Sequence, residues 1–190
     1  MNEAAHIADL QHRIATTGDQ DAYKELFLRF QPLLKKFAYS ICHSREAAEE
    51  VVSDVFMRIW VKRKTLDHIQ NLKLYLYIAT RNFSLNYLRA RQRHSTLQIE
   101  ELKIDTIALG DDPHEHLLSV EMQQRIAMVV NDLPPQCKIV FKLVKEDGLR
   151  QREVAELLHI TPKTVENQLA IAVKRIGKAV LASNDRVPKE

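Results

Sequence analysis

The sequence predicts an all-α fold of two small helical domains joined by a linker. Only 4 of the 190 residues are glycine, and no long β-branched run alternates with polar residues, which favours helices over sheets. Apolar residues recur at helical spacing in two regions, before Arg93 and after Pro113. Between these regions the periodicity fades and acidic residues dominate, as is typical of a linker.

Charge follows the same division of the chain. The formal net charge of +3 is the balance of two basic blocks, 21–95 and 122–190, an acidic stretch between them and a slightly acidic start at 1–20. Two basic blocks indicate two modules that each meet a polyanion, although surface solubility would also explain either block. The expected segments are an N-terminal helical extension (1–20), a first domain (21–93), an acidic linker (94–113), a second domain (114–182) and a tail (183–190).

The first two helices are predicted from their ends. Residues 3–16 form an amphipathic pattern that stops near Gly18, and Asp19 or Asp21 can cap the helix that follows. Pro32 lacks a backbone N–H, so we expect this second helix to kink or restart there. Its early apolar residues are predicted to be core: Tyr23, Leu26, Phe27 and Phe30.

A third helix is predicted to begin at Ser44, with glutamates in its early turns that complement the positive end of the helix dipole. Its buried stripe should be Ala48, Val51, Val52, Val55 and Ile59. The opposite side carries Glu50, Asp54, Met57 and Val61. Methionine and valine are unusual on a solvated face, so we interpret this side as a surface for a basic partner, with additional core packing as the alternative.

After the basic run Lys62-Arg63-Lys64, a loop is predicted through about Gln70. A long, largely buried helix is predicted to follow it and to end at Arg93. Between two apolar stripes, this helix carries a polar stripe of Tyr75, Asn82, Asn86, Arg89 and Arg93. An aromatic ring, amides and guanidinium groups can stack on bases exposed in a single strand and hydrogen-bond to them. The alternative is a solvated seam.

The second domain is predicted to be helical throughout. One helix should run to about Asn131, and a second should start at Pro134-Pro135 and end at Gly148. Residues 151–176 then predict two short helices joined by a tight turn, with Ile160 as the buried plug of that turn.

The last of these helices carries the pattern of a DNA reader. Thr161 can cap it and Pro162 fits its first position. Its core face should be Val165, Leu169, Ala172, Val173 and Ile176. Its other side carries Lys163, Thr164, Asn167, Gln168, Ile171, Lys174 and Arg175. Such groups suit base edges and phosphates in a major groove, so we predict a DNA-binding helix-turn-helix, with an ordinary helical hairpin as the alternative.

No cofactor, metal site or catalytic centre is predicted. Cys42 and Cys137 are far apart and lack a C-x-x-C spacing, so we expect buried thiols. We interpret the acidic and histidine cluster at 111–116 as a helix start rather than a metal site. No nucleophile, base and oxyanion set is visible, so no enzyme is expected. Without a signal-peptide pattern or a run of ~20 apolar residues, a cytoplasmic protein with no membrane insertion is expected.

The chain resembles the extracytoplasmic-function group of bacterial RNA polymerase sigma factors. The resemblance rests on AAEEVVSDVFMRIW at 47–60, NYLRARQR at 86–93 and the segment 133–176, which begins LPPQCKIVF. It implies a protein that binds core RNA polymerase, directs it to specific promoters and catalyses no reaction itself.

By this resemblance, the segment 47–60 docks on the clamp helices of the polymerase β′ subunit. The protein is also expected to contact the β flap of core polymerase. The loop 63–72 and the helix after it capture and open the minus-ten element, with flipped bases held near the loop and by Asn82. The C-terminal module reads the minus-thirty-five element. An anti-sigma partner, often anchored in the inner membrane, is implied as well. Ser53 stands where the family commonly has Gln, and Tyr75 where Trp is frequent.

Two other functions remain open on sequence alone. A helix-turn-helix regulator that binds duplex DNA as a dimer would recognise a palindromic site and bind it tightly without polymerase. A docking protein whose helices at 23–93 bind only a partner would leave transcription unchanged in Asn82→Ala and Arg89→Ala.

Overall fold

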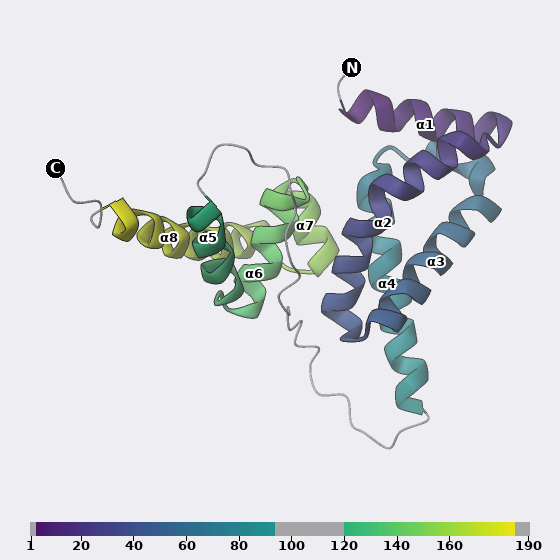
Figure 1. Cartoon of the computed structure of the whole chain (residues 1–190). Helices are drawn as coiled ribbons and strands as arrows, with labels where there is room; N and C mark the ends of the chain where they lie inside the picture. Colours follow the sequence, from purple (N-terminus) through teal and green to yellow (C-terminus); the bar gives the residue numbers. More distant parts are fainter. Residues whose placement is uncertain (1–2, 94–119, 185–190) are drawn as a thin grey trace. The chain divides into compact units, whose positions relative to one another are not determined.

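The computed structural model describes residues 3–93 and 120–184, which form two compact units in which every element is helical (Figure 1). The first unit holds α1 (Glu3–Thr17), α2 (Gln20–Cys42), α3 (Arg45–Val61), the 3-10 helix η1 (Arg63–His68) and α4 (Leu72–Arg93). The second holds α5 (Val120–Asn131), α6 (Pro135–Phe141), the π-helical turn η2 (Lys142–Glu146), α7 (Gln151–Leu158) and α8 (Pro162–Asn184). The predicted all-α class is confirmed for these residues, whereas the expected linker at 94–113 and the cluster at 111–116 lie outside them.

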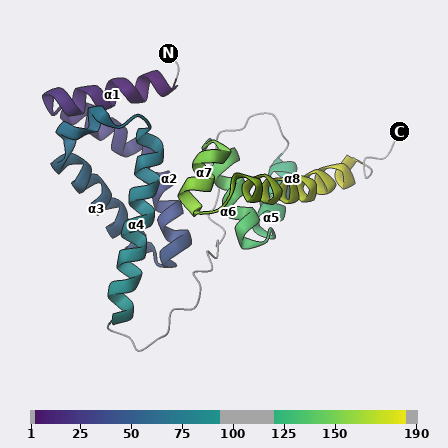
Figure 2. The ribbon, with the colours of Figure 1, turned by 180° about the vertical axis from the view of Figure 1, so that it is seen from behind.

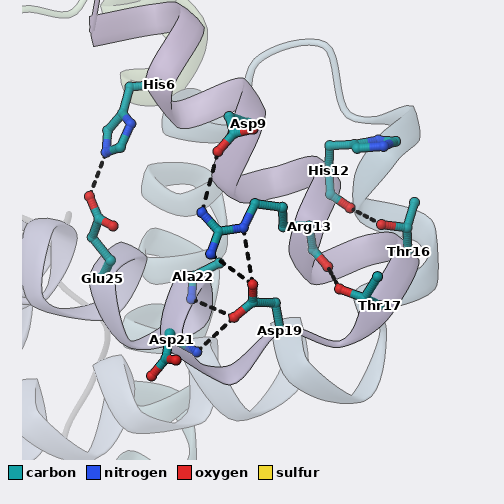
Figure 3. Close-up of polar contacts among 10 residues, drawn as sticks. All are labelled: His6, Asp9, His12, Arg13, Thr16, Thr17, Asp19, Asp21, Ala22 and Glu25. Carbon is teal, nitrogen blue, oxygen red and sulfur yellow. Dashed lines mark hydrogen bonds and ion pairs between the residues drawn. The ribbon is translucent and has the colours of Figure 1, made fainter.

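One aspartate organises the turn between α1 and α2. Gly18 adopts a left-handed conformation, with φ of 66°, and Asp19 Oδ1 then accepts hydrogen bonds from the N–H groups of Asp21 at 2.9 Å and Ala22 at 3.0 Å. The guanidinium of Arg13 donates to the other carboxylate oxygen of Asp19 at 2.7 Å (Figure 3). The predicted cap is therefore Asp19, and α2 begins at Gln20.

Helix α2 is continuous from Gln20 to Cys42, with Pro32 inside it, so the helix does not restart at the proline. Pro32 itself is exposed, and Phe30 and Leu34 on either side of it are buried. Burial of these side chains holds the helix together although one backbone hydrogen bond is missing.

The core of the first unit lies among α2, α3 and α4, and α1 crosses one end of them (Figures 1 and 2). Helix α3 buries the predicted stripe of Ala48, Val51, Val52, Val55 and Ile59. Ring centroids are 4.9 Å apart for Phe27 and Phe56 and 5.3 Å apart for Phe37 and Tyr77. Burial of one such side chain contributes about 1.5–3 kcal/mol, so this core decides which sides of α3 and α4 stay exposed.

The 3-10 helix η1 extends to His68, so the prediction of a loop after Lys64 was wrong as far as that residue. Leu66 is only 1% exposed, and the N–H of Ile69 donates to the carbonyl of Leu66 at 2.8 Å, which closes the last turn. Helix α1, far away in sequence, provides part of the burial. Local sequence patterns cannot reveal a contact between segments this far apart in the sequence.

The core of the second unit joins α5, α6 and α8. It contains Val130, Leu133, Cys137 and Ala172, with Ile126, Phe141 and Ile176 packed against them. Cys42, in the first unit, and Cys137 are both buried and free, as predicted. The prediction that Val173 is core was wrong, because it is 49% exposed. At about 100° per residue, Val173 lies roughly 80° around α8 from the buried Val165. Ile160 is half-buried rather than fully buried.

Candidate nucleic-acid and partner interfaces

Local signals fix the geometry of the α7–α8 hairpin. The N–H of Arg150 donates to Glu153 Oε2 at 2.7 Å, which begins α7, and His159 ends it in the left-handed region at φ 54°. The N–H of Ile160 donates to the carbonyl of Ala155 at 3.0 Å, and the N–H of Thr164 donates to Thr161 Oγ1 at 3.1 Å. The predicted Thr161 cap is thus present, and the helix behind it is held at a fixed place by the buried face of α7.

The predicted reading residues of α8 are defined as the α8 face: Lys163, Thr164, Asn167, Gln168, Ile171, Lys174 and Arg175. All are exposed except Thr164 and Gln168, which are half-buried. Ile171 is 43% exposed, a large apolar side chain among polar ones. A mixed surface of this kind can contact thymine methyl groups, base edges and phosphates together.

Several groups of the α8 face already have partners within the second unit. Gln168 Oε1 accepts a hydrogen bond from the thiol of Cys137 at 2.7 Å, and burial raises the pKa of that thiol. Arg175 donates to the carbonyl of Asp132 at 3.4 Å. Lys163 pairs with Glu166 at 2.9 Å. Asn167 and Lys174 lie between these anchored groups.

The predicted partner residues on α3 are defined as the α3 surface: Glu50, Asp54, Met57 and Val61. Met57 is 63% exposed and Val61 is 71% exposed, while Asp54 is half-buried and Glu50 is exposed. An open hollow of about 410 Å³ lies beside them, lined by Asp54, Met57, Arg58, Val61, Lys62 and Phe83. Sequence reasoning did not include Arg58, Lys62 or Phe83 in this surface.

Phe83 comes from α4, so α3 alone does not build the hollow. The guanidinium of Arg58 lies 5.8 Å from the centroid of the Phe83 ring, at the range of a cation–π contact. The spacing of Asp54, Arg58 and Lys62 at four-residue intervals places them along one side of α3 and could have indicated the contribution of Arg58 and Lys62. Only the packing of α4 on α3 indicates Phe83.

The polar stripe of α4 is defined as the α4 stripe: Tyr75, Asn82, Asn86, Arg89 and Arg93. Asn82, Asn86 and Arg89 are exposed, Tyr75 is half-buried, and the side chain of Arg93 lies outside the described part of the unit. Arg89 donates to Asn86 Oδ1 at 3.1 Å, so each of these two side chains restrains the orientation of the other. The neighbouring Arg81, missed by sequence reasoning, is half-buried, and this burial lowers its pKa, as does the charge of Arg89.

The η1 segment offers a mixed set of exposed groups. Lys64, Thr65, Asp67 and His68 are exposed, whereas Leu66 is buried. Arg63 is half-buried, with its guanidinium 4.8 Å from the centroid of the Trp60 ring and donating to the Trp60 carbonyl at 2.9 Å. The segment therefore presents cations, a hydroxyl and an imidazole on a surface whose backbone is anchored.

Comparison with known proteins identifies both units. The model of Sigma-70 region 2 matches residues 26–94, and the model of Sigma-70, region 4 matches residues 123–176, together more than half of the chain. The ECF RNA polymerase sigma factor SigW of Bacillus subtilis is 23% identical over 159 residues, which are 80% of this chain and 85% of that protein. The chain belongs to the extracytoplasmic-function sigma factors.

A second relative of this sigma factor is the probable RNA polymerase sigma factor RfaY of Xanthomonas campestris pv. campestris. It is 27% identical over 184 residues, which are 94% of this chain but 46% of that protein. The sigma factor thus spans less than half the length of this relative. Among solved structures, the sigma factor RpoE in complex with the anti-sigma factor NepR from Bartonella quintana has a TM-score of 0.54 and 22% identity, covering 83% of this chain and 96% of that chain. At this identity the likeness supports the fold alone.

Membership of this family makes the protein a transcription initiation factor, which serves promoter recognition by RNA polymerase and is not an enzyme. The alternative of a dimeric regulator explains the region 4 match but not the region 2 match. Neither unit contains, within residues 3–93 and 120–184, a helix with the length and hydropathy of a membrane span. Within the described part of the chain, histidine, cysteine and acidic side chains nowhere gather in threes as a metal site requires.

Proposed function

We propose that the sigma factor binds core RNA polymerase through the α3 surface. The observation that carries this proposal is the exposure of Met57 and Val61, at 63% and 71%, on a helix whose opposite side is core. Covering exposed apolar side chains with a partner removes them from water, which lowers the free energy of the complex. The partner is the clamp-helix region of the β′ subunit, and the β flap meets the second unit.

Charge around the hollow defines the partner further. Glu50 and Asp54 require basic groups opposite them, whereas Arg58 and Lys62, which line the hollow together with Asp54, require acidic groups or carbonyl oxygens. An apolar side chain from the polymerase would sit between them, against Met57, Val61 and Phe83. Such a mixed ring around an apolar centre resembles the usual arrangement of a protein interface.

We propose that the α4 stripe and the segment 63–72 capture the minus-ten element. Exposed amides at Asn82 and Asn86 can hydrogen-bond to the edges of unpaired bases, and Tyr75 offers a ring for stacking. The cations of Arg89 and Arg81 lie on the same helix, where they can neutralise phosphates. Unstacking costs a few kcal/mol per base step, and binding of the released bases offsets it.

We propose that the α8 face reads the minus-thirty-five element from the major groove. Anchoring of Gln168 to Cys137 and of Arg175 to Asp132 supports this, because pre-positioned side chains lose less entropy when they bind DNA. Asn167, next to Gln168, and Lys174, next to Arg175, would contact a base edge and a phosphate or guanine respectively.

Regulation and place in the cell follow from the same proposal. The solved sigma factor from Bartonella quintana is held by an anti-sigma factor, and we propose a partner of that class, anchored in the inner membrane or free, for this chain. The sigma factor would act in the cytoplasm together with its polymerase. Its functional segments would be 1–20, 21–93 for polymerase and the minus-ten element, 94–113 as linker, 114–182 for the minus-thirty-five element, and 183–190 as tail.

The test is run-off transcription by bacterial core polymerase on a pool of promoter fragments, with and without the protein, followed by sequencing of the transcripts. Transcripts that require the protein and share two unlike elements at one spacing are expected. Asn82→Ala should weaken the minus-ten preference and Asn167→Ala the minus-thirty-five preference.

No dependence of any transcript on the protein, together with tight binding of a symmetrical duplex, would overturn the proposal. Transcription that depends on the protein but is unchanged in Asn82→Ala and Arg89→Ala would instead identify the first unit as a docking module alone.

A further inference from the structure

Helix α1 lies outside the segment that matches Sigma-70 region 2, which begins at residue 26. It nevertheless contacts η1, the segment that follows α3. Gln11 on α1 is only 8% exposed, and its side-chain amino group donates to the carbonyl of Leu66 at 2.5 Å and to the carbonyl of Ile69 at 2.7 Å. Because both neighbours are carbonyl oxygens, the amino group and not the amide oxygen must face them.

These two bonds act on the last turn of η1, which is a short 3-10 helix. A 3-10 helix has poorer hydrogen-bond geometry than an α-helix and is used only in short pieces. The last turn of η1 is closed by the backbone bond from the Ile69 N–H to the Leu66 carbonyl, at 2.8 Å. Gln11 therefore holds the two carbonyls at the start and end of this last turn with one side chain.

Other contacts from the same end of the chain support η1 along its length. His12 Nδ1 lies 3.2 Å from Asp67 Oδ1, and Gly18 lies against the side chain of Arg63. The exposed residues of η1 are thus carried on a backbone that is fixed by α1 and by the turn after it: Lys64, Thr65, Asp67 and His68. None of the η1 residues that α1 holds is adjacent to it in sequence.

We propose that Gln11 is a positioning residue for promoter selectivity, which sets the path of residues 66–69 and so decides which bases of the minus-ten element the exposed η1 side chains accept. The inference rests on the proposed function, in which the segment 63–72 captures these bases. Helix α1 is then part of the DNA-reading apparatus without touching DNA.

The experiment measures transcription by the full-length protein and core polymerase on a pool of promoters that vary at the minus-ten element and, separately, at the minus-thirty-five element. Gln11→Met keeps the length of the side chain and removes both donors. A roughly tenfold loss of preference among minus-ten variants is expected, with the minus-thirty-five preference and the affinity for core polymerase unchanged. Gln11→Asn, which keeps the amide but cannot reach both carbonyls, should give a smaller loss in the same direction and serves if Gln11→Met does not fold.

Two controls separate the possible failures. Gln20→Met changes an exposed glutamine at the start of α2 and should alter neither preference. His68→Ala removes an exposed η1 side chain and tests whether η1 reads DNA at all.

A changed minus-ten preference in His68→Ala with none in the Gln11 variants would overturn the role of Gln11 and leave the proposed function standing. No change in any of these variants would overturn the inference, while loss of all transcription that depends on the protein is the separate result that overturns the proposed function. Equal losses at the two elements, or loss of polymerase binding, in the Gln11 variants would identify Gln11 as a general stability residue and would also overturn the inference.

Discussion

Gly18 lies against Arg63 so closely that a Cβ at Gly18 would be 3.3 Å from Arg63 Nε. Gly18 also has a φ of 66°, a conformation that side chains with a Cβ rarely adopt. The guanidinium of Arg63 is itself held by Trp60, at 4.8 Å from the ring centroid. The turn after α1, the end of α3 and the start of η1 therefore meet at a point where an added methyl group would require Arg63 to shift.

Gly18→Ala is expected to destabilise the first unit by about 1–2 kcal/mol, because alanine strains the left-handed turn and displaces Arg63. Trp60 is the only tryptophan of the chain, so its fluorescence during urea unfolding reports on this unit. Gly177→Ala is the matched control, since Gly177 lies inside α8 with nothing within 4 Å of its missing Cβ. It should gain about 0.5–1 kcal/mol in helix stability, read by circular dichroism. A loss at Gly177 equal to that at Gly18 would contradict this account.

Asp19 makes the stability of the first unit depend on acid pH. Its pKa lies below the ordinary value of 3.8, mainly because the N–H of Ala22 bonds to the carboxylate and next because Arg13 does. Since the unfolded state takes up the proton first, stability from ionised Asp19 is present above pH 3.8 and is lost as pH falls through the lower folded-state pKa.

Asp19→Asn keeps an oxygen that can cap α2 but removes the charge that Arg13 and the helix dipole favour. The Tm of this variant should therefore fall less steeply than that of the parent between about pH 5 and pH 2. Thermal unfolding at a series of pH values checks this, with Asp21→Asn as control for the loss of a nearby surface carboxylate. Parallel curves of Tm against pH for Asp19→Asn and the parent would show that Asp19 is not the source of the pH dependence.

Met57→Asp is expected to weaken binding of core polymerase by roughly 10- to 100-fold, because a charge would be buried at the centre of the apolar contact. Leu28→Asp is the matched control, since Leu28 on α2 is 61% exposed and Met57 is 63% exposed. Equilibrium binding to labelled core polymerase measures both, with circular dichroism to establish that both variants fold. Equal losses in the two variants would mean that α3 has no special role.

Asn167→Ala should reduce discrimination at one base pair of the minus-thirty-five element by about 1–3 kcal/mol, since a side-chain amide reads two atoms of an adenine edge. Val173→Ala changes an exposed residue that points away from the α8 face and should leave this discrimination intact. Competition binding of holoenzyme to duplexes with single base changes provides the measurement. Uniform weakening across all duplexes in Asn167→Ala would indicate a phosphate contact instead.

Local chemistry makes several features of the fold predictable from sequence. Asp19 and Thr161 are recognisable as helix caps because a side-chain oxygen next to free N–H groups acts within its own turn. The buried stripe of α3 follows from helical periodicity in the same way. The α3 surface is predictable as well, because Met57 and Val61 lie outside the buried stripe and are therefore expected to be exposed.

Features that depend on distant contacts escape such reasoning. Phe83 enters the hollow from α4, and η1 gains its order partly from Gln11, 55 residues before Leu66. Val173 follows the buried Ala172 in sequence and so matches a core pattern, but it is exposed. The width of the buried stripe on α8 depends on where α5 and α6 pack against it. Sequence periodicity gives the direction of a face and not its width.

The packing of α4 on α3 has a consequence for genetics. Helix α3 carries the proposed polymerase contact, and α4 carries the proposed minus-ten contact. Both helices pack into one hydrophobic core, in which Phe56 of α3 and Tyr77 of α4 are buried. Conditional alleles that enlarge or shrink this interior should lose both activities at the same temperature. Alleles that separate the two activities should fall only on exposed positions, so a screen for separated defects would map each surface independently of the other.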